Sequence, residues 1–429
     1  MAVASSAIIL DHRRPSVTTD TATITRRRTP LVLVNLAALL SATGNGITIV
    51  ALPWLVLEQT GRATDAGIVA GAATLPLLLA SLFSGTVIDR FGRRLTSLVS
   101  DSLSAVSVAA IPILAATVGL SVPLIALLAA IGAVFDPAGI AARESMLPAA
   151  AAEAGWSLDR SNSVYEATYS TAYLIGPGVG GMLIAITGAV DTLWVTAGCF
   201  ALSIATIALL RVDGSGKPDP ETRPTSMWSG TLEGVKFVWR SRLLRTIALV
   251  DMALVALYMP VEGVLYPAYF TELGQPAQLG WVLAAMSVGG VIGALAYGAL
   301  AAVAKRRTLM LLAVGGLGIC MVGMAFLPPI WLTLTLAFLI GLVFGPVGPI
   351  ANYAMQTLSP EHMRGRVVGV MTSSAYAAGP LGYLAAGPLI DTFGIRPTFF
   401  ALAIPVVVIS LVCFALPALR DLDLPHKKA

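Results

Sequence analysis

Charged residues are scarce in this sequence. Asp, Glu, Lys and Arg make up only 12% of the 429 residues, whereas hydrophobic residues make up 56%. Because a soluble domain carries roughly 25% charged residues, this composition excludes an ordinary water-soluble fold. It indicates an all-α integral membrane protein whose chain crosses the bilayer many times.

Cysteine and histidine are also rare, which limits the possible chemistry. Cys199, Cys320 and Cys413 lie inside apolar runs, so we expect neither a disulfide nor a metal site from them. The three histidines fall in tails or loops, which leaves carboxylates to carry protons through a membrane. The absence of HExxH, Gly-x-Ser-x-Gly and Walker motifs argues against an enzyme and against an ATP-driven pump. We expect no cofactor.

Long apolar runs recur along the whole chain. A helix needs about 20 such residues to cross about 30 Å of hydrocarbon. We predict twelve transmembrane helices, at roughly 31–57, 64–88, 95–118, 121–146, 162–187, 190–210, 243–269, 277–303, 308–327, 330–357, 366–388 and 396–418.

The basic residues predict the orientation of these helices. If both termini are cytoplasmic, all of the 27 Lys and Arg except Arg62 and Arg396 belong to the cytoplasmic side. This distribution follows the positive-inside rule. It predicts a multi-pass protein of the cytoplasmic membrane, surrounded by lipid, with both termini inside the cell.

One long polar break divides the chain. Residues 212–242 begin VDGSGKPDPETRPTS, which is typical of a linker, and continue TLEGVKFVWRSR, which predicts a short helix at the membrane surface. That helix would turn apolar residues toward lipid and basic residues toward phosphates: Leu232, Val235 and Val238 on one side, Lys236, Arg240 and Arg242 on the other. We predict a disordered cytoplasmic tail at 1–29, six-helix halves at 30–211 and 243–418, and a second tail at 419–429.

The two halves resemble each other weakly. VFDPAG at 134–139 matches VFGPVG at 343–348, and AYLIGPGVGG at 172–181 matches AYAAGPLGYL at 375–384. Two further pairs are PWLVLE with PAYFTE and GTVIDRFGRR with GALAAVAKRR, and all four pairs keep the same order in the two halves. Duplicated halves are typical of transporters in which a midplane substrate site lies between two halves that rock against each other.

The stretch GTVIDRFGRR, between the second and third predicted helices, resembles the Gly-x-x-x-Asp-Arg-x-Gly-Arg-Arg/Lys signature of the major facilitator superfamily. The resemblance implies that these residues belong to a cytoplasmic gate: Gly85, Asp89, Arg90, Gly92, Arg93 and Arg94. The second copy of this stretch has Ala302 in place of Asp89, which predicts an asymmetric gate.

GPGVGG in the fifth predicted helix is similar to the signature of proton-coupled exporters in the same superfamily. The matching residues are Gly176, Pro177, Gly180 and Gly181. Further stretches, ALPWLVLEQTG and MRGRVVGVMTS among them, resemble a group of multidrug efflux pumps. That resemblance implies proton-driven export of varied drugs, tetracyclines and aminoglycosides included. Its relatives look acidic where this chain has Asn45.

Ionisable groups at membrane depth are costly unless they are paired or hydrated, so they are functional candidates. For Asp136 two interpretations stay open: a proton-coupling acid, or an ion pair with Arg143. Glu166 is either a proton carrier or cation contact, or a gate-side partner of Arg143 or Arg160. We place Arg143 and Glu144 at the cytoplasmic gate.

The seventh predicted helix carries Asp251 and Glu262, eleven residues apart and close to one face of the helix. Asp251 is a further coupling candidate. Glu262 lies near Tyr266, and an acid beside aromatic rings suits amphipathic cations through charge and cation-π contact. The alternative for Glu262 is a solvated acid at the outer mouth.

Several other residues are candidates for contact with substrate. Asn45, Asn352 and Gln356 either bind substrate or form hydrogen bonds between helices. Trp54 either lines a cavity or anchors its helix at the membrane interface.

Together with the resemblance to efflux pumps, the sequence predicts a monomeric drug exporter driven by proton antiport, with small amphipathic or cationic drugs and protons as partners and no nucleic acid. The alternative is an importer or facilitator of a nutrient or siderophore with the same fold.

Overall fold

The computed structural model describes residues 27–211, 227–359 and 364–423. Within these ranges the regular structure is entirely helical. The terminal residues of both predicted tails and the first part of the predicted linker, residues 212–226, lie outside the described ranges.

The first half of the chain forms seven helices, one connecting helix follows, and the second half forms the other helices. The helices of the first half are α1 (Thr29–Thr60), α2 (Ala63–Phe91), α3 (Arg93–Thr117), α4 (Val122–Ala133), α5 (Asp136–Ala154), α6 (Leu158–Thr187) and α7 (Ala189–Leu209). The connecting helix is α8 (Met227–Arg240). The second half contains α9 (Arg242–Pro260), the π-helical turn η2 (Val261–Leu265), α10 (Tyr266–Glu272), α11 (Pro276–Val303), α12 (Arg306–Ala325), α13 (Ile330–Phe344), α14 (Val347–Leu358), α15 (Arg364–Phe393), α16 (Ile395–Ala415) and a 3-10 segment η4 (Pro417–Asp423).

These helices are consistent with twelve spans. The pairs α4–α5 and α13–α14 and the series α9–η2–α10 each continue as one segment, and nine segments of the described chain are long and apolar enough to cross a membrane. The remaining long helices are α2, α6 and α15. The crowded region predicted at 162–210 is indeed two helices, α6 and α7.

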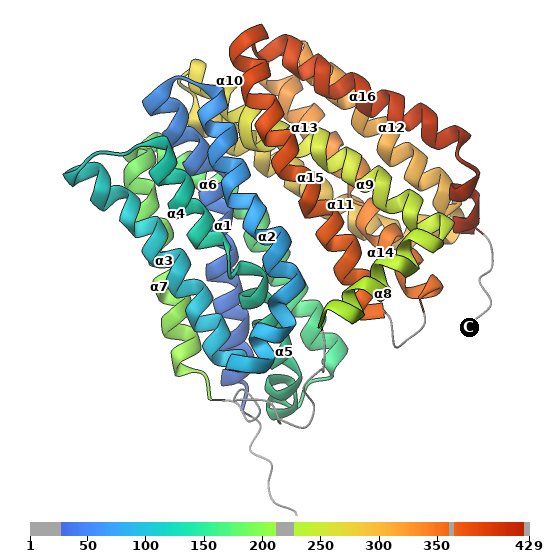
Figure 1. Ribbon diagram of the computed structural model, residues 1–429, viewed down its shortest axis with the longest axis horizontal. Coiled ribbons are helices and arrows are strands. Elements are labelled where there is room, and N and C mark those ends of the chain that lie inside the picture. Colours follow the sequence, from blue (N-terminus) through green and yellow to red (C-terminus); the bar gives the residue numbers. More distant parts are fainter. Residues whose placement is uncertain (1–26, 212–226, 360–363, 424–429) are drawn as a thin grey trace, which may run out of the picture.

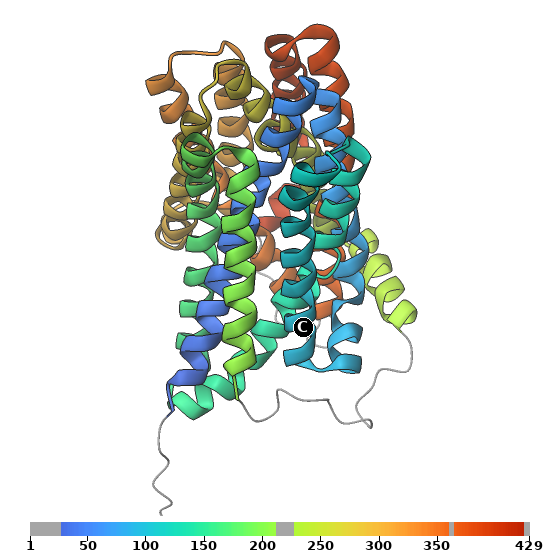
Figure 2. The same cartoon turned by 90° about the vertical axis from the view of Figure 1, so that its left-hand side faces the viewer.

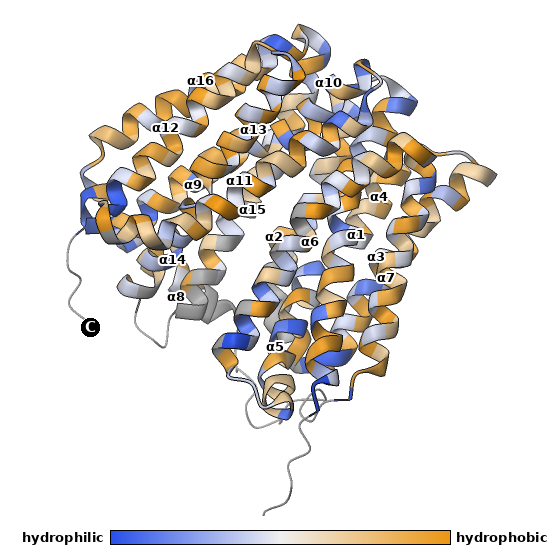
Figure 3. Cartoon of the chain, turned by 180° about the vertical axis from the view of Figure 1, so that it is seen from behind, coloured by the Kyte–Doolittle hydropathy of each residue, from blue (hydrophilic) through white to orange (hydrophobic). Residues whose placement is uncertain are grey.

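Large apolar side chains cover much of the outer surface. Ile186 and Leu295 are each 76% exposed and Val303 is 85% exposed. Hydrophobic residues dominate the middle of the helices, whereas hydrophilic residues gather near their ends (Figure 3). A surface of this kind is stable only in contact with lipid.

The two halves meet at one end of the molecule and diverge toward the other, which gives a V shape (Figure 1). Within the first half the long helices run roughly parallel (Figure 2). We call the wide side of the V the basic end, because α2 ends there with Arg90 and α3 begins there with Arg93 and Arg94. We call the narrow side, where α2 begins and α15 ends, the closed end.

The weak sequence repeat is also a structural repeat. VFDPAG lies where α4 passes into α5, and VFGPVG lies where α13 passes into α14. Proline has no backbone N–H and cannot continue the hydrogen-bond ladder, so Pro137 and Pro346 interrupt the two helices at matching places. The tight turns that follow α6 and α15 also match, because Gly188 and Gly394 both have φ of +84°. Glycine tolerates this left-handed region without strain.

The connecting helix α8 turns part of its apolar face toward protein. Val238 is only 3% exposed and belongs to the hydrophobic core, and α8 packs against α15 and α9. Leu232 and Trp239 remain on the exposed side. The prediction that Val238 faces lipid is therefore wrong: an amphipathic helix buries its apolar face wherever an apolar partner is available, and here that partner is protein.

The halves meet along two seams near the closed end, one between α2 and α15 and one between α6 and α11. At the first seam a Cβ on Gly387 would lie 2.6 Å from Thr64 Cα, and one on Gly67 would lie 2.5 Å from the Tyr383 carbonyl oxygen. At the second seam a Cβ on Gly181 would lie 2.6 Å from the Pro276 carbonyl oxygen. Glycine allows the backbones to approach this closely, as in other membrane helix pairs.

The first seam predicts a contrast between two glycines of α15. Gly387→Ala should destabilise the protein by about 1–3 kcal/mol, because the added methyl overlaps backbone atoms of α2. Gly369→Ala is the matched control, because nothing lies within 4 Å of its Cβ position. It should be neutral or stabilising by about 0.5–1 kcal/mol, since alanine favours helix. Thermal unfolding of the two purified variants in detergent measures the difference; equal midpoints would contradict tight packing at Gly387.

Candidate functional site

A cavity of about 250 Å³ lies between the two halves. The first half supplies most of its wall, from α1 to α7. The second half contributes Met259, Glu262 and Tyr383. The two glycine seams close the space on the side of the closed end, and the halves diverge toward the basic end (Figure 1).

Asp136 lines this cavity at the break between α4 and α5. It is the first residue of α5, so its carboxylate lies near the positive end of that helix. Ser104 Oγ lies 3.2 Å from Asp136 Oδ1 and 2.9 Å from the Gly132 carbonyl oxygen. A hydroxyl donates only one proton, so these two acceptors compete for it. Asn45 of α1 lines the same cavity.

Glu262 faces the same cavity from the second half. It lies in the π-helical turn η2, directly after Pro260, and turns of this type often occur at functional sites. Tyr258 Oη donates a hydrogen bond of 2.6 Å to Glu262 Oε1. The Tyr383 ring packs against Gly263, where a Cβ would lie 2.5 Å from the ring. An acid and two aromatic residues therefore lie together on this side of the cavity.

The cavity has a negative character. Among the described residues that line it, the charged side chains are the two acids Asp136 and Glu262, and none is Lys, Arg or His. The aromatic residues Tyr169, Phe200 and Tyr383 form part of the same wall. Carboxylates with aromatic faces can hold either protons or an organic cation.

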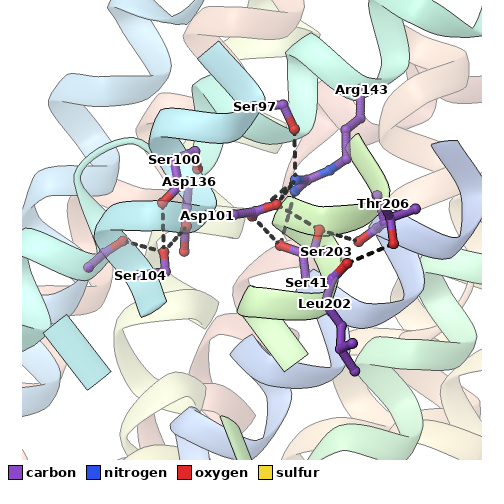
Figure 4. Close-up of polar contacts among 12 residues, drawn as sticks. Ser41, Ser97, Ser100, Asp101, Ser104, Asp136, Arg143, Leu202, Ser203 and Thr206 are labelled. Carbon is purple, nitrogen blue, oxygen red and sulfur yellow. Dashed lines mark hydrogen bonds and ion pairs between the residues drawn. The ribbon is translucent and has the colours of Figure 1, made fainter. Parts of the chain in front are cut away.

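Arg143 lies close to Asp136 in sequence but is bound elsewhere (Figure 4). Its Nη1 lies 3.1 Å from both carboxylate oxygens of Asp101 on α3. Asp101 is 1% exposed and Arg143 is 2% exposed. The pairing proposed for Arg143 with Asp136 is therefore wrong as a description of this structure, because the two side chains on α5 serve different neighbours.

Serines from three helices complete the Asp101–Arg143 pair. Ser203 Oγ on α7 donates to Asp101 Oδ2 at 2.7 Å, and Ser41 Oγ on α1 donates to Asp101 Oδ1 at 3.0 Å. Arg143 also donates to Ser97 Oγ on α3 and to Ser41 Oγ. The network joins α1, α3, α5 and α7, and places Arg143 inside the first half (Figure 4).

Sequence reasoning did not single out Asp101. Its signal was present, because Ser97, Ser100, Ser104 and Ser107 recur at helical spacing around it in an otherwise apolar span. A polar stripe of this kind marks the face of a helix that turns toward other helices. All four serines are buried.

The structure does not bring the other candidate acids to the cavity. Glu166 and Glu144 are exposed, and neither lines the cavity. Asp251 does not line it either. Asp251 precedes Glu262 by eleven residues, which corresponds to about 16 Å along a helix. The cavity does not extend that far along α9.

The remaining substrate candidates have different surroundings. Trp54 is 5% exposed and packs in the core, and Tyr266 is 2% exposed with its ring centroid 5.7 Å from that of Phe399. Neither lines the cavity. Asn352 is exposed on α14, and the side chain of Gln356 lies outside the described part of the structure.

The residues predicted for a cytoplasmic gate lie in the last turns of α2, at Gly92 and at the start of α3. The surroundings of Gly85 and the side chain of Asp89 lie outside the described part, whereas the turn at Gly92 has φ of +86°. Arg94 donates to the carbonyl oxygens of Ile207 and Ala208 at the end of α7. Arg90 is exposed, and Arg93 is partly buried at the start of α3.

The GPGVGG signature has two packing roles. Gly176 and Gly180 press α6 against α1, where a Cβ on Gly176 would lie 2.8 Å from Gly46 Cα. The neighbouring Pro177 contacts the same glycine. Gly181 faces α11 of the other half. The signature therefore joins a helix pair within one half to a seam between the halves.

Comparisons with known proteins agree with this architecture. The Major Facilitator Superfamily model matches residues 34–380 and 263–428. The chain is 53% identical over 404 residues to the multidrug efflux pump Tap of Mycolicibacterium fortuitum, covering 94% of this chain and 99% of that one. It is 52% identical over 400 residues to Tap of Mycobacterium tuberculosis, covering 92% and 96%.

Two solved structures show the same fold at low sequence identity. The nucleoside transporter NupG superposes with a TM-score of 0.75 at 12% identity, covering 90% of this chain and 98% of that one. A D-xylose-proton symporter superposes with a TM-score of 0.70 at 13% identity, covering 93% and 98%.

The buried network predicts a stability defect. Asp101→Asn should destabilise the protein by about 3–5 kcal/mol, because it leaves the Arg143 guanidinium buried without a counter-charge. Thermal unfolding in detergent measures the loss. The matched control is Asp191→Asn, an exposed acid in the first turn of α7, which should unfold like the wild type. An unchanged midpoint for Asp101→Asn would contradict the role of the pair.

Proposed function

The chain belongs to the major facilitator superfamily, and we propose on this basis that it is a multidrug efflux transporter that exchanges drugs for protons. The observation that supports this proposal most directly is the cavity between the halves, with Asp136 and Glu262 as its charged lining residues. The similarity to the Tap pumps over more than nine-tenths of the chain supports drugs as the substrate class.

The proposed cycle uses the acids of the cavity. A carboxylate in a low-dielectric site is stable either protonated or beside a cation, so proton and cationic drug compete for the same group. With the basic end in the cytoplasm, as the positive-inside rule predicts, the halves diverge on the cytoplasmic side, and in the proposed cycle drug enters the cavity from there. Rocking of the halves then exposes it to the outside.

The energetics are sufficient for export. Exchange of a neutral drug for one proton moves one positive charge inward, and each 100 mV of membrane potential contributes about 2.3 kcal/mol to that step. At about 1.4 kcal/mol per factor of ten, this sustains roughly a 50-fold gradient of a neutral drug. Exchange of a monovalent cationic drug for one proton moves no net charge, so the pH gradient alone drives it, at about 1.4 kcal/mol per pH unit.

The deciding experiment uses purified protein in liposomes, with an imposed pH gradient and a panel of drugs. Inside-out vesicles with an acidic interior should accumulate drug, and collapse of the pH gradient should abolish accumulation. Transport that is indifferent to the pH gradient, or that runs only in the opposite direction, would instead support a facilitator or importer of the same fold.

Asp136→Asn should abolish pH-driven drug accumulation by removing the proposed coupling group. Drug counterflow without a gradient should persist, because the cavity keeps its shape. Glu153→Gln is the matched control, as an acid on the same helix α5 that does not line the cavity. If the Asp136→Asn protein reaches the membrane and still accumulates drug at the wild-type rate, Asp136 is not the coupling acid.

Glu262→Gln should lower the transport rate of cationic drugs about tenfold and that of neutral drugs less. The reason is that attraction between the Glu262 carboxylate and a drug cation in the cavity contributes on the order of 1–2 kcal/mol. Asp251→Asn, an acid of the preceding helix that does not line the cavity, is the control. Initial rates of uptake for a cationic and a neutral drug measure the ratio. An equal loss for both drugs would show that Glu262 does not select for charge.

A further inference from the structure

Asp391 connects the two halves at the closed end. It lies in the last turn of α15, in the second half. Its Oδ1 accepts a hydrogen bond of 2.8 Å from the backbone N–H of Ala63, and its Oδ2 accepts one of 2.9 Å from the backbone N–H of Thr64. Ala63 and Thr64 are the first two residues of α2, in the first half. We call this contact the Asp391 cap.

The start of α2 needs an acceptor that its own sequence does not supply. The first N–H groups of a helix have no partner within the helix, and the residue before the helix usually provides one through its side chain. Here that residue is Arg62, and its side chain makes no such bond. The carboxylate from the other half therefore occupies the place of the missing cap and also faces the positive end of the helix dipole.

The cap depends on how close the two helices are. One turn before Asp391, Gly387 brings the backbone of α15 into contact with Ala63 and Thr64. Both hydrogen bonds are already at ordinary length, so a separation of α2 and α15 by 1 to 2 Å, roughly, breaks both. The carboxylate is exposed, so water can hydrate it when the bonds break. The contact is thus reversible, which a fully buried charge would not be.

The second seam has no equivalent. The turn glycines Gly188 and Gly394 follow α6 and α15 at matching places, so the counterpart of Asp391 is Ala185, in the last turn of α6, which carries no carboxylate. The helix that faces it, α11, begins with Pro276, which has no N–H to offer. The cap is therefore confined to the seam between α2 and α15.

We propose that Asp391 is the outer gate residue of the transport cycle. It holds the closed end shut while the cavity is open at the basic end, and it releases α2 when the cavity opens outward. This inference rests on the alternating access proposed above. Arg62 and Asp65 of α2 are charged neighbours of Asp391, and they lie 4.0 Å from each other. The Asp391 carboxylate accepts the hydrogen bonds from the start of α2.

A conformational measurement tests the gate without reference to any drug. Thr48 lines the cavity from α1, so Thr48→Cys, in a chain whose three native cysteines are replaced by serine or alanine, reports access to the cavity. Labelling with a membrane-impermeant maleimide from outside intact cells should be slow in this background. Asp391→Ala removes both hydrogen bonds of the cap and should raise the labelling rate on the order of tenfold, because water replaces part of each bond at this exposed site.

Asp391→Asn keeps one acceptor oxygen and the side-chain volume, so it should raise the rate by a smaller factor and decides the matter if the alanine variant does not reach the membrane. Asp191→Asn, an exposed acid at the closed end of α7, is the matched control and should label like the parent. An unchanged rate in both Asp391 variants would overturn the gate.

Drug transport by the same proteins separates the two proposals. Faster labelling of the Asp391 variants with no pH-driven drug accumulation by the wild type would support the gate and reject drug–proton exchange. Drug accumulation by the wild type with unchanged labelling of the Asp391 variants would support drug–proton exchange and reject the gate. Rapid labelling of the parent from outside would contradict the assignment of the closed end to the outer face, and with it the outer gate.

Discussion

The buried pair of Asp101 and Arg143 is the interaction on which the first half depends. Two charges that are almost inaccessible to water must satisfy each other, and serines from three helices add hydrogen bonds to them. Because the guanidinium is bound to Asp101, the described residues that line the cavity beside Asp136 include no arginine. The pair therefore fixes four helices and at the same time leaves the cavity negative.

The negative cavity and the glycine seams together describe a transporter in one state of its cycle. The seams bring backbone against backbone at the closed end, so that small rotations about them are amplified at the basic end, where the halves diverge (Figure 1). The two seams differ in chemistry: one is capped by a carboxylate and the other begins with a proline. A duplicated fold has in this way become asymmetric where its halves meet.

Much of the architecture was readable from the sequence. The scarcity of charge, the length of the apolar runs and the repeated VFxPxG and GP motifs led to two six-helix halves, and the motifs fall at matching places in the structure. Asp136 and Glu262 were selected because ionisable groups are rare in spans, and both line the cavity. Asn45 was a candidate as a polar group in an apolar span, and it lines the same cavity.

Other choices failed because they needed knowledge of which helices are neighbours. Arg143 follows Asp136 by two helical turns, but its long side chain reaches α3 and finds Asp101. Val238 belongs to an amphipathic pattern that fits lipid or protein equally well, and it packs against protein. Trp54 and Tyr266 are aromatic residues that fill the core.

The sequence by itself determined that this is a duplicated helical membrane protein, because hydrocarbon accepts only helices whose backbone bonds are satisfied and whose charges are few. It also marked Asp136 and Glu262 as acids inside the predicted spans. Only the tertiary structure decided which acids are paired, which face the cavity and which join the halves. Those outcomes depend on contacts between residues far apart in the chain, such as Asp391 with Ala63, and one-dimensional spacing carries no information about such contacts.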